Sequence, residues 1–220
     1  MRQSIFHNAD HKIIEKRIFD YLNENNNFLS PRTLQSPRAA GDALQELVGE
    51  KFGDLAKEFC SEYSNDFARR SMADLAFTDK FGNYHIVDVK THREDTKFNM
   101  PNLTSVERLS RLYQDDKNFF SVIMIKYKIE GAALLVTEVT FKPIEFLSWD
   151  CLTIGALGWG QIQIANSNKI TINENHSRKS WMLELCDILL EFYPKEISKI
   201  GDRIKRFEVV KEFWLQKQDI

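Results

Sequence analysis

Two aspartates and one lysine come together in the predicted pairing of two short strands. Segments 73–78 and 84–90 have the apolar character of strands, and the intervening DKFGN is typical of a hairpin turn. Side chains alternate along a strand, so Asp88 and Lys90 share one face of the second strand. Antiparallel pairing brings Asp74 alongside the end of that strand. We therefore expect two carboxylates and one ammonium group at the sheet edge.

This trio suits the hydrolysis of phosphodiesters. Two carboxylates can bind Mg²⁺ while leaving it several waters. The metal lowers the pKa of a bound water and neutralises charge on a phosphate in the transition state. A lysine beside it can orient the attacking water and add positive charge. The alternative for Asp74, Asp88 and Lys90 is a structural ion pair at the sheet edge.

An acidic residue two positions before a lysine occurs four times in the chain, so the tripeptide alone is weak evidence. Only Asp88-Val89-Lys90 ends an apolar strand and has an acidic residue on the paired strand. The other three fall in polar stretches, where solvated charge is the expected role. They are Asp10-His11-Lys12, Asp95-Thr96-Lys97 and Asp115-Asp116-Lys117.

The remaining pattern predicts an α/β (α+β) fold with a central mixed β-sheet flanked by helices. Segments 119–129 and 132–141 are almost continuously apolar, which predicts strands of a sheet covered on both faces. We expect one domain over 1–220. Its parts are N-terminal helices in 11–63, including one helix over 39–63, the catalytic hairpin and sheet in 73–141 with a polar loop over 91–105, and C-terminal helices in 179–215 with a break near Pro194.

Composition excludes several classes of protein. The 220 residues include 30 Lys+Arg and 32 Asp+Glu, a net charge of −2, which argues against binding nucleic acid by bulk charge alone. The apolar fraction of 43% excludes a disordered chain. The three cysteines have no zinc-site spacing and are expected to be reduced core thiols. Without a signal-peptide pattern or an apolar run of about 20 residues, we expect a cytoplasmic protein with no membrane partner.

With these residues in view, the chain resembles the PD-(D/E)XK nuclease superfamily, in particular type II restriction endonucleases of the EcoRV/HincII kind. Asp74 matches the first acidic position and Asp88-Val89-Lys90 matches the (D/E)XK element, although Ala73 replaces the proline of the motif. The similar layout covers 39–141. The resemblance implies a restriction-endonuclease-like core and a Mg²⁺ cofactor held by Asp74, Asp88 and the Val89 backbone carbonyl. Lys90 would position and activate the water.

Members of this superfamily often add an acidic residue from the preceding helix to the metal site. Gln45 is set against that position, and the available carboxylates are Glu46, which we take as the metal ligand, and Glu50. Exposed helix charges are the alternative for both.

The loop after Lys90 is where such enzymes usually meet DNA. Asn can read adenine, Arg or Lys can read guanine, and Ser and Thr commonly hold phosphates. An ordinary polar surface loop is the alternative. A second DNA-facing loop over 158–163 is considered, with Trp159 expected in the core. The DNA-binding residues we expect are Thr91, His92, Arg93, Lys97, Asn99, Asn102, Thr104 and Ser105.

The C-terminal segment combines basic residues with apolar residues in a helical rhythm. A solvated basic face on a packed helix is the preferred interpretation, and a phosphate-clamping face or a dimer helix is the alternative. The basic residues are Lys195, Lys199, Arg203, Lys205, Arg206, Lys211 and Lys217.

The resemblance implies a type II restriction endonuclease that cuts both strands of a short double-stranded DNA site as a homodimer, with a companion DNA methyltransferase. One alternative is a DNA-repair or structure-specific nuclease of the same superfamily. The other is a non-catalytic, sequence-specific DNA-binding module. The recognition sequence, the cut position and the type of end stay open.

Overall fold

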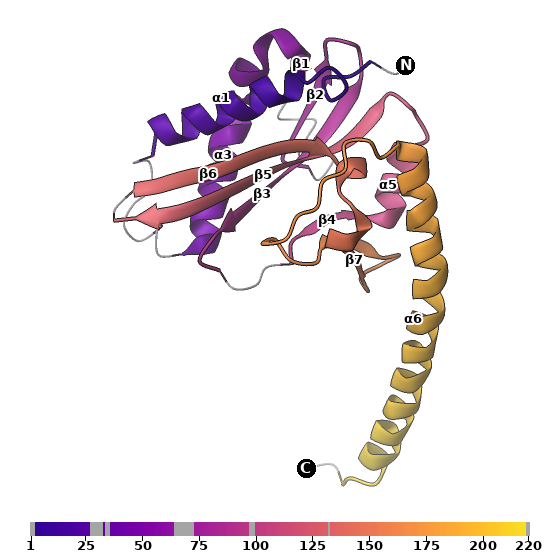
Figure 1. The fold of residues 1–220 in the computed structure, drawn as a ribbon. Helices are drawn as coiled ribbons and strands as arrows, with labels where there is room; N and C mark the ends of the chain where they lie inside the picture. Colours follow the sequence, from indigo (N-terminus) through magenta and orange to yellow (C-terminus); the bar gives the residue numbers. More distant parts are fainter. Residues whose placement is uncertain are drawn as a thin grey trace. The chain divides into compact units, whose positions relative to one another are not determined.

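A five-stranded sheet lies at the centre of the first of two compact units, Met1–Asn175 and His176–Ile220 (Figure 1). The computed structural model describes residues 3–26, 33, 36–63, 73–96, 100–131 and 133–218. Strands β1 (Cys60–Tyr63), β2 (Leu75–Asp79), β3 (Tyr84–Arg93), β5 (Asn118–Glu130) and β6 (Ala133–Pro143) lie in the order β1-β2-β3-β5-β6. Only β3 and β5 run parallel, which confirms a mixed sheet.

The turn between β2 and β3 is held by Asp79. Its Oδ1 accepts hydrogen bonds from the backbone N–H groups of Phe81 and Asn83, both at 2.9 Å. Gly82 has a φ of +78°, a conformation that favours glycine. The predicted hairpin is therefore confirmed, and its turn fixes the register of Leu75 against Val87.

Two helices cover one face of the sheet, as Figure 1 shows for α1 (Asp10–Glu24) and α3 (Pro37–Ala56). Helix α1 is joined to β6 through Glu15, which accepts a 2.7 Å hydrogen bond from the Phe141 N–H. Helix α3 begins at a Ser36 cap followed by Pro37, a favoured start signal. It approaches β3 closely, because a Cβ on Gly41 would lie 2.4 Å from Thr91 Oγ1.

The opposite face of the sheet is also covered. Its buried side chains include Ile86, Val122 and Met124. Beyond the central sheet the chain forms α5 (Val106–Leu112) and a three-stranded antiparallel sheet in the order β4-β8-β7. These strands span Asn102–Ser105, Gln161–Ile164 and Leu152–Gly155, and short 3₁₀ turns occupy Lys57–Phe59, Ile144–Phe146 and Trp149–Cys151.

Two boundaries predicted around the β2–β3 hairpin are wrong. The helix predicted over 39–63 ends at Ala56, and 60–63 pairs with β2 as strand β1. The loop predicted over 91–105 is strand at both ends, because β3 continues to Arg93 alongside β5 and 102–105 forms β4 beside β8. The conformation of these polar segments is decided by pairing with distant strands, and the local sequence pattern gives no information about that pairing.

The helix break predicted near Pro194 is also wrong. The second unit contains α6 (Arg178–Leu215), one helix of 38 residues with Pro194 inside it. Proline removes one backbone hydrogen bond and crowds the preceding turn. The helix nevertheless continues through this position to Leu215. Among the described residues no helix is long and apolar enough to cross a membrane.

The prediction of three core thiols is correct only for Cys151. Cys151 is buried, Cys60 is half-buried at the margin of the core, and Cys186 is exposed on α6. All three are free thiols. Burial raises the pKa of the Cys60 and Cys151 thiols, which lowers their reactivity.

Candidate active site at the end of the β2–β3 hairpin

Asp74, Asp88 and Lys90 come together beside the start of β2, as their spacing predicts. Leu75 pairs with Val87, so Asp74, one residue earlier, lies at the level of Asp88 on the neighbouring strand. Lys90 Nζ donates a 2.8 Å hydrogen bond to Asp88 Oδ1. The Lys90 side chain is 25% exposed and that of Asp88 is 11% exposed. The Asp88 carboxylate is therefore almost enclosed, whereas the Lys90 ammonium group that contacts it is open to solvent.

The surroundings of Asp88 disfavour its charged form. The pKa of Asp88 is raised to about 7, chiefly by burial and then by the neighbouring Asp74 carboxylate, and the Lys90 ammonium opposes this shift. The second carboxylate oxygen, Oδ2, is buried and accepts no hydrogen bond from a donor group of the described residues, and the two aspartates hydrogen-bond to each other only when one of them is protonated. A buried carboxylate with an unsatisfied oxygen is costly to the folded state. Such groups gather at functional sites.

Asp74 is held from two sides. Its Oδ2 accepts a 2.6 Å hydrogen bond from the Val89 backbone N–H. Gln45 on α3 also hydrogen-bonds the Asp74 carboxylate, and this contact lowers the pKa. Burial is the larger effect, and the pKa of Asp74 is raised overall despite the Val89 N–H and the Lys90 charge. Gln45 stands where superfamily members often have an acidic residue, and here it orients the Asp74 carboxylate.

The donor set fits a magnesium ion. Mg²⁺ is commonly held by one or two carboxylates and keeps several waters. Asp88 Oδ2 lacks a partner, and the N–H and C=O of one strand residue point to the same side, so the Val89 carbonyl faces Asp74. Among the described residues there is no cluster of three or more His, Cys, Asp or Glu side chains that could hold a metal.

Two adjoining clefts, of about 380 and 450 Å³, border Lys90 and Asp74, whereas Asp88 lines neither of them. Lys90 lines the first, Asp74 lines the second, and Asp42 and Gln45 of α3 line both. Asp42 was not among the predicted site residues. Its place on α3 three residues before Gln45, on the same face of the helix, is the signal that could have found it.

The two acidic candidates on α3 lie at the edge of the site. Glu46 and Glu50 line the same cleft as Asp74, and both are exposed. Neither is among the groups that act on the Asp74 or Asp88 pKa, whereas Gln45 is. The choice between Glu46 and Glu50 is thus left to experiment, with Asp42 as a third carboxylate.

The structure separates the residues predicted to contact DNA into three groups. Thr91, His92 and Arg93 lie on β3 and line the cleft beside Lys90. Thr91 and Arg93 are half-buried, and Arg93 donates a 2.6 Å hydrogen bond to Asp95. His92 is buried, with Nε2 2.8 Å from Asn168 Oδ1. His92 is therefore enclosed, and the DNA contact predicted for it stays a prediction.

The second group lies on β4, where local structure already uses most of the side chains. Thr104 is buried, and the Ser105 hydroxyl caps α5 by accepting a hydrogen bond from the Arg108 N–H at 3.2 Å. Asn102 is exposed, and its Oδ1 accepts a 2.5 Å hydrogen bond from Gln163. Of these, only Asn102 is open to a ligand. The third group, Lys97 and Asn99, lies outside the described residues.

Arg108 on α5 is a cation that sequence reasoning missed. Burial lowers its pKa, while the charge of Asp88 raises it, so the guanidinium lies within electrostatic reach of the site. The sequence places Arg108 twenty residues after Asp88 in a different element, and only the packing of α5 on the sheet relates the two.

The turn that joins β7 to β8 differs from its predicted role. Trp159 is 61% exposed and Leu157 is 65% exposed, so the expectation of Trp159 in the core is wrong. Gly158 and Gly160 both have positive φ, which gives a tight turn that leaves little room to fold the indole inward.

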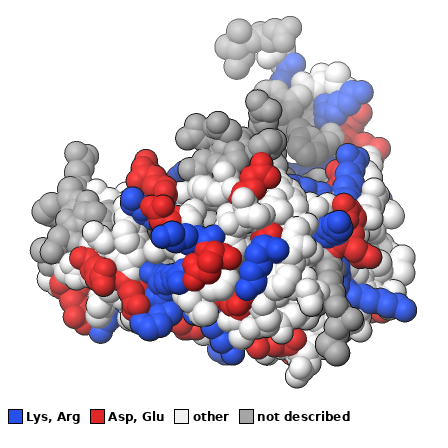
Figure 2. Space-filling model, turned by 90° about the horizontal axis from the view of Figure 1, so that it is seen from above, with Lys and Arg blue, Asp and Glu red and all other residues white. Residues whose placement is uncertain are grey.

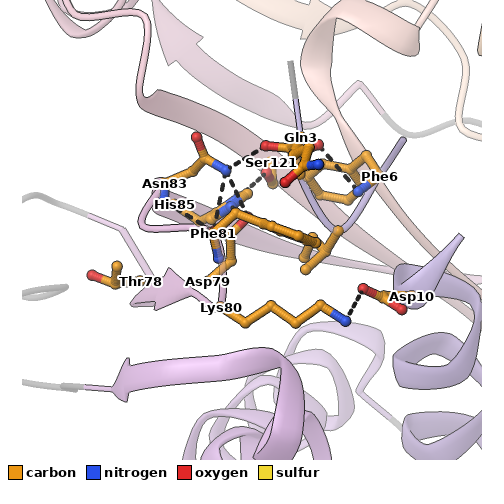
Figure 3. A network of polar contacts seen from close by, with 12 residues as sticks. Gln3, Phe6, Asp10, Thr78, Asp79, Lys80, Phe81, Asn83, His85 and Ser121 are labelled. Atoms are coloured by element: carbon orange, nitrogen blue, oxygen red, sulfur yellow. Dashed lines mark hydrogen bonds and ion pairs between the residues drawn. The ribbon is translucent and has the colours of Figure 1, made fainter. Parts of the chain in front are cut away.

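A second polar cluster lies at the closed end of the hairpin and has a structural role (Figure 3). Asp79 Oδ2 is 3.1 Å from His85 Nε2, and His85 Nδ1 is 3.4 Å from Ser121 Oγ. These three groups form an acid–histidine–hydroxyl series, but each is completely buried. The His85 ring is stacked between Phe77 and Phe119. No substrate could reach it, so the cluster fixes the turn.

Charge on the face shown in Figure 2 is mixed. Lys and Arg lie interspersed with Asp and Glu there, in keeping with a net charge of −2. This face therefore has no field of a single sign that would attract nucleic acid at long range. No family model matches the chain, and no curated protein matches it.

Proposed function

We propose that the protein is a Mg²⁺-dependent endonuclease that hydrolyses phosphodiester bonds in double-stranded DNA, in the manner of a type II restriction endonuclease. The Asp88 carboxylate carries the proposal. It is buried next to Asp74, one oxygen accepts a hydrogen bond from Lys90, and the other accepts none from the donor groups of the described residues. A buried carboxylate of this kind lowers the stability of the folded chain without ligands. A bound cation and a phosphate would offset that cost, which explains why the arrangement is kept.

Asp74, Asp88 and the Val89 carbonyl would hold Mg²⁺. When bound there, Mg²⁺ supplies Lewis-acid stabilisation of the scissile phosphate and lowers the pKa of a coordinated water. The Val89 N–H and Gln45 hold Asp74 in place, and Lys90 holds Asp88. The two carboxylates are therefore oriented before any ligand arrives, which lowers the cost of binding.

Lys90 and Arg108 provide positive charge at the reacting phosphate. The Lys90 ammonium faces the cleft, where it can orient the attacking water and stabilise charge that develops on the phosphate. Arg108 approaches Asp88 from α5, and a guanidinium suits the fixed geometry of phosphate oxygens. Thr91 and Arg93 line the same cleft and are suited to backbone contacts, and Asn102 to contact with a base edge.

The proposal of a restriction endonuclease also includes two protein partners, a second copy of the chain and a DNA methyltransferase. A palindromic duplex site is met by two-fold protein symmetry, so we propose a homodimer with one active site for each strand. A companion DNA methyltransferase would protect the same sequence in the host genome. Both follow from the resemblance of the Asp74 and Asp88-Val89-Lys90 motif.

Digestion of a sequenced plasmid with Mg²⁺, followed by mapping of the ends, tests the proposal. We expect discrete fragments with the wild type and none with Asp88→Ala. Asp20→Ala, at an exposed pair with Lys16, is the matched control and should cut normally. Normal cutting by Asp88→Ala would overturn the site assignment. Nicked circles or cleavage set by DNA structure would replace restriction with a repair role, and binding with Ca²⁺ but no cutting with Mg²⁺ would leave a DNA-binding module.

A further inference from the structure

Helix α6 carries a continuous apolar stripe with the spacing of a coiled coil. Its residues follow alternating steps of three and four over 183–214, which is the heptad pattern of a and d positions. We call this set the heptad stripe. Its a positions are Leu183, Leu190, Ile197, Ile204 and Lys211, and its d positions are Cys186, Tyr193, Ile200, Phe207 and Trp214.

The heptad stripe is exposed, contrary to the packed helix that the sequence favoured. Leu190 is 72% exposed, Ile197 and Phe207 are each 69% exposed, and Trp214 is 65% exposed. A contiguous apolar surface of this kind marks an interaction site. A helix that packs on a sheet has a broader stripe with a period of 3.6, whereas a strict period of 3.5 matches a second helix of the same kind.

We propose that the heptad stripe pairs with the same stripe of a second copy of this chain, as a parallel two-stranded coiled coil. Ile197 and Ile204 at the central a positions suit two strands, whereas Ile200 at a d position also suits a higher number of strands, so the choice of two rests on the single charged a residue. Lys211 is the one charged residue at a or d, and a single polar a residue sets register and strand number at some cost in stability.

The charges that flank the stripe complement a second copy. Arg203 is at a g position and Glu208 is at the following e position. In a parallel pair, Arg203 of each chain lies beside Glu208 of the other, and such g-to-e pairs set the choice and orientation of the partner. Within the described chain neither side chain forms an ion pair, so both are available.

The residues that would weaken a coiled coil lie outside the stripe. Pro194 and Gly201 are both at e positions, on the flank of the helix pair. Val209 is exposed but lies at an f position, on the side opposite the stripe. The contact surface is therefore apolar from Leu183 to Phe207, and Lys211 is the one charged residue between there and Trp214 along the stripe.

Orientation has a consequence for the proposed nuclease. A parallel pair joins both copies of the first unit at the same end of the coiled coil, whereas an antiparallel pair would separate the two junctions by about 57 Å of helix. Two active sites on one short duplex favour the parallel arrangement, and this step alone rests on the proposed function. Self-association can be measured without DNA, so the two proposals fail separately.

Sedimentation equilibrium of the full chain at micromolar concentration tests the pairing. We expect a dimer for the wild type, and Ile197→Lys with Ile204→Lys should raise the dissociation constant by at least about 100-fold. Val209→Lys, an equally exposed apolar position off the stripe, should leave the dimer intact. A monomeric wild type would overturn the proposal. So would a double variant that stays dimeric with an unchanged helical circular dichroism signal.

Cys186 reports the register. In a parallel pair the two Cys186 residues share one d layer, at a separation suited to a disulfide. With Cys60→Ser and Cys151→Ser in place, mild oxidation should link the dimer covalently. Moving the thiol to the f position, with Cys186→Ser and Asp202→Cys, should abolish the link. A dimer that Cys186 fails to link would overturn the parallel register.

Discussion

The backbone N–H of Val89 donates a 2.6 Å hydrogen bond to Oδ2 of Asp74. This bond joins the acidic residue before β2 to the central residue of the Asp-x-Lys element on β3. Asp74 therefore anchors the strand pair through its oxygen, and substitutions can separate this role from the metal-binding role that we propose for its charge.

Asp74→Asn should separate these functions. Asparagine keeps an oxygen that can accept the Val89 hydrogen bond but removes the charge. We expect plasmid cleavage to fall by about 10²- to 10³-fold, with the free energy of unfolding changed by less than about 1 kcal/mol. Asp74→Ala removes both the hydrogen-bond acceptor and the charge. Its free energy of unfolding, measured by urea denaturation, should be about 1–2 kcal/mol lower than that of Asp74→Asn. Equal stability of the two variants would contradict the anchoring function.

Asp88→Asn should stabilise the protein while abolishing cleavage. The buried carboxylate has an unsatisfied oxygen, and a neutral amide avoids the cost of a buried charge. We expect urea denaturation at pH 8 without Mg²⁺ to give a free energy of unfolding about 0.5–2 kcal/mol higher than that of the wild type. A clear loss of stability would mean that the ion pair with Lys90 outweighs the burial of Asp88.

Lys90→Met tests the ammonium group by itself. Methionine keeps most of the apolar stem and removes the charge, so the fold should be retained. We expect the cleavage rate to fall by about 10²- to 10³-fold while DNA binding measured with Ca²⁺ is kept. Lys126→Met, which removes another strand lysine paired with Glu138, is the matched control and should cut within about twofold of the wild type.

The hairpin and the convergence of Asp74, Asp88 and Lys90 could be predicted from sequence because their determinants are local. Alternation places Asp88 and Lys90 on one face, and the Asp79 turn sets the register that brings Asp74 beside them. The mixed sheet covered on both faces follows from the apolar run that becomes β5. These features depend on residues close together in the chain.

The surroundings of the trio could not be predicted, because they depend on packing between distant elements. Asp42 and Gln45 reach the site because Gly41 lets α3 approach β3, and Arg108 reaches it through α5. Strand β4 is four mostly polar residues that pair with β8, nearly sixty residues away in sequence. The exposed heptad spacing on α6 was in the sequence, but exposure itself is a tertiary property.

Stability should fall in mild acid because of His11. Its Nε2 is 2.7 Å from Lys142 Nζ and its Nδ1 is 3.1 Å from the Ile5 carbonyl oxygen, so the neutral ring donates to Ile5 and accepts from Lys142. Burial and the Lys142 charge lower the pKa of His11, although Glu15 and Glu174 oppose them.

The sign follows from proton binding. Below the ordinary histidine pKa of about 6.5, the unfolded chain binds a proton that folded His11 does not. The contribution of neutral His11 to the free energy of unfolding is therefore complete above about pH 6.5. It is lost as the pH falls toward the lowered pKa that His11 has in the folded protein. We expect urea denaturation to show a smaller free energy of unfolding at pH 5.5 than at pH 7.5. His11→Gln should reduce this difference, by no more than about 1.4 kcal/mol per pH unit. An unchanged difference would rule out His11 as the source.

Gly41→Ala should displace the helix that completes the site. The added Cβ would lie 2.4 Å from Thr91 Oγ1, so α3 must move away from β3 or Thr91 must rotate. We expect a loss of about 1–3 kcal/mol in the free energy of unfolding, with weaker cleavage because Gln45 moves with α3. Gly49→Ala is the matched control on the same helix, where an added Cβ meets nothing within 4 Å, and it should stabilise the protein by up to about 1 kcal/mol. If the two substitutions changed stability and cleavage alike, contact between Gly41 and Thr91 would not be what positions α3 at the active site.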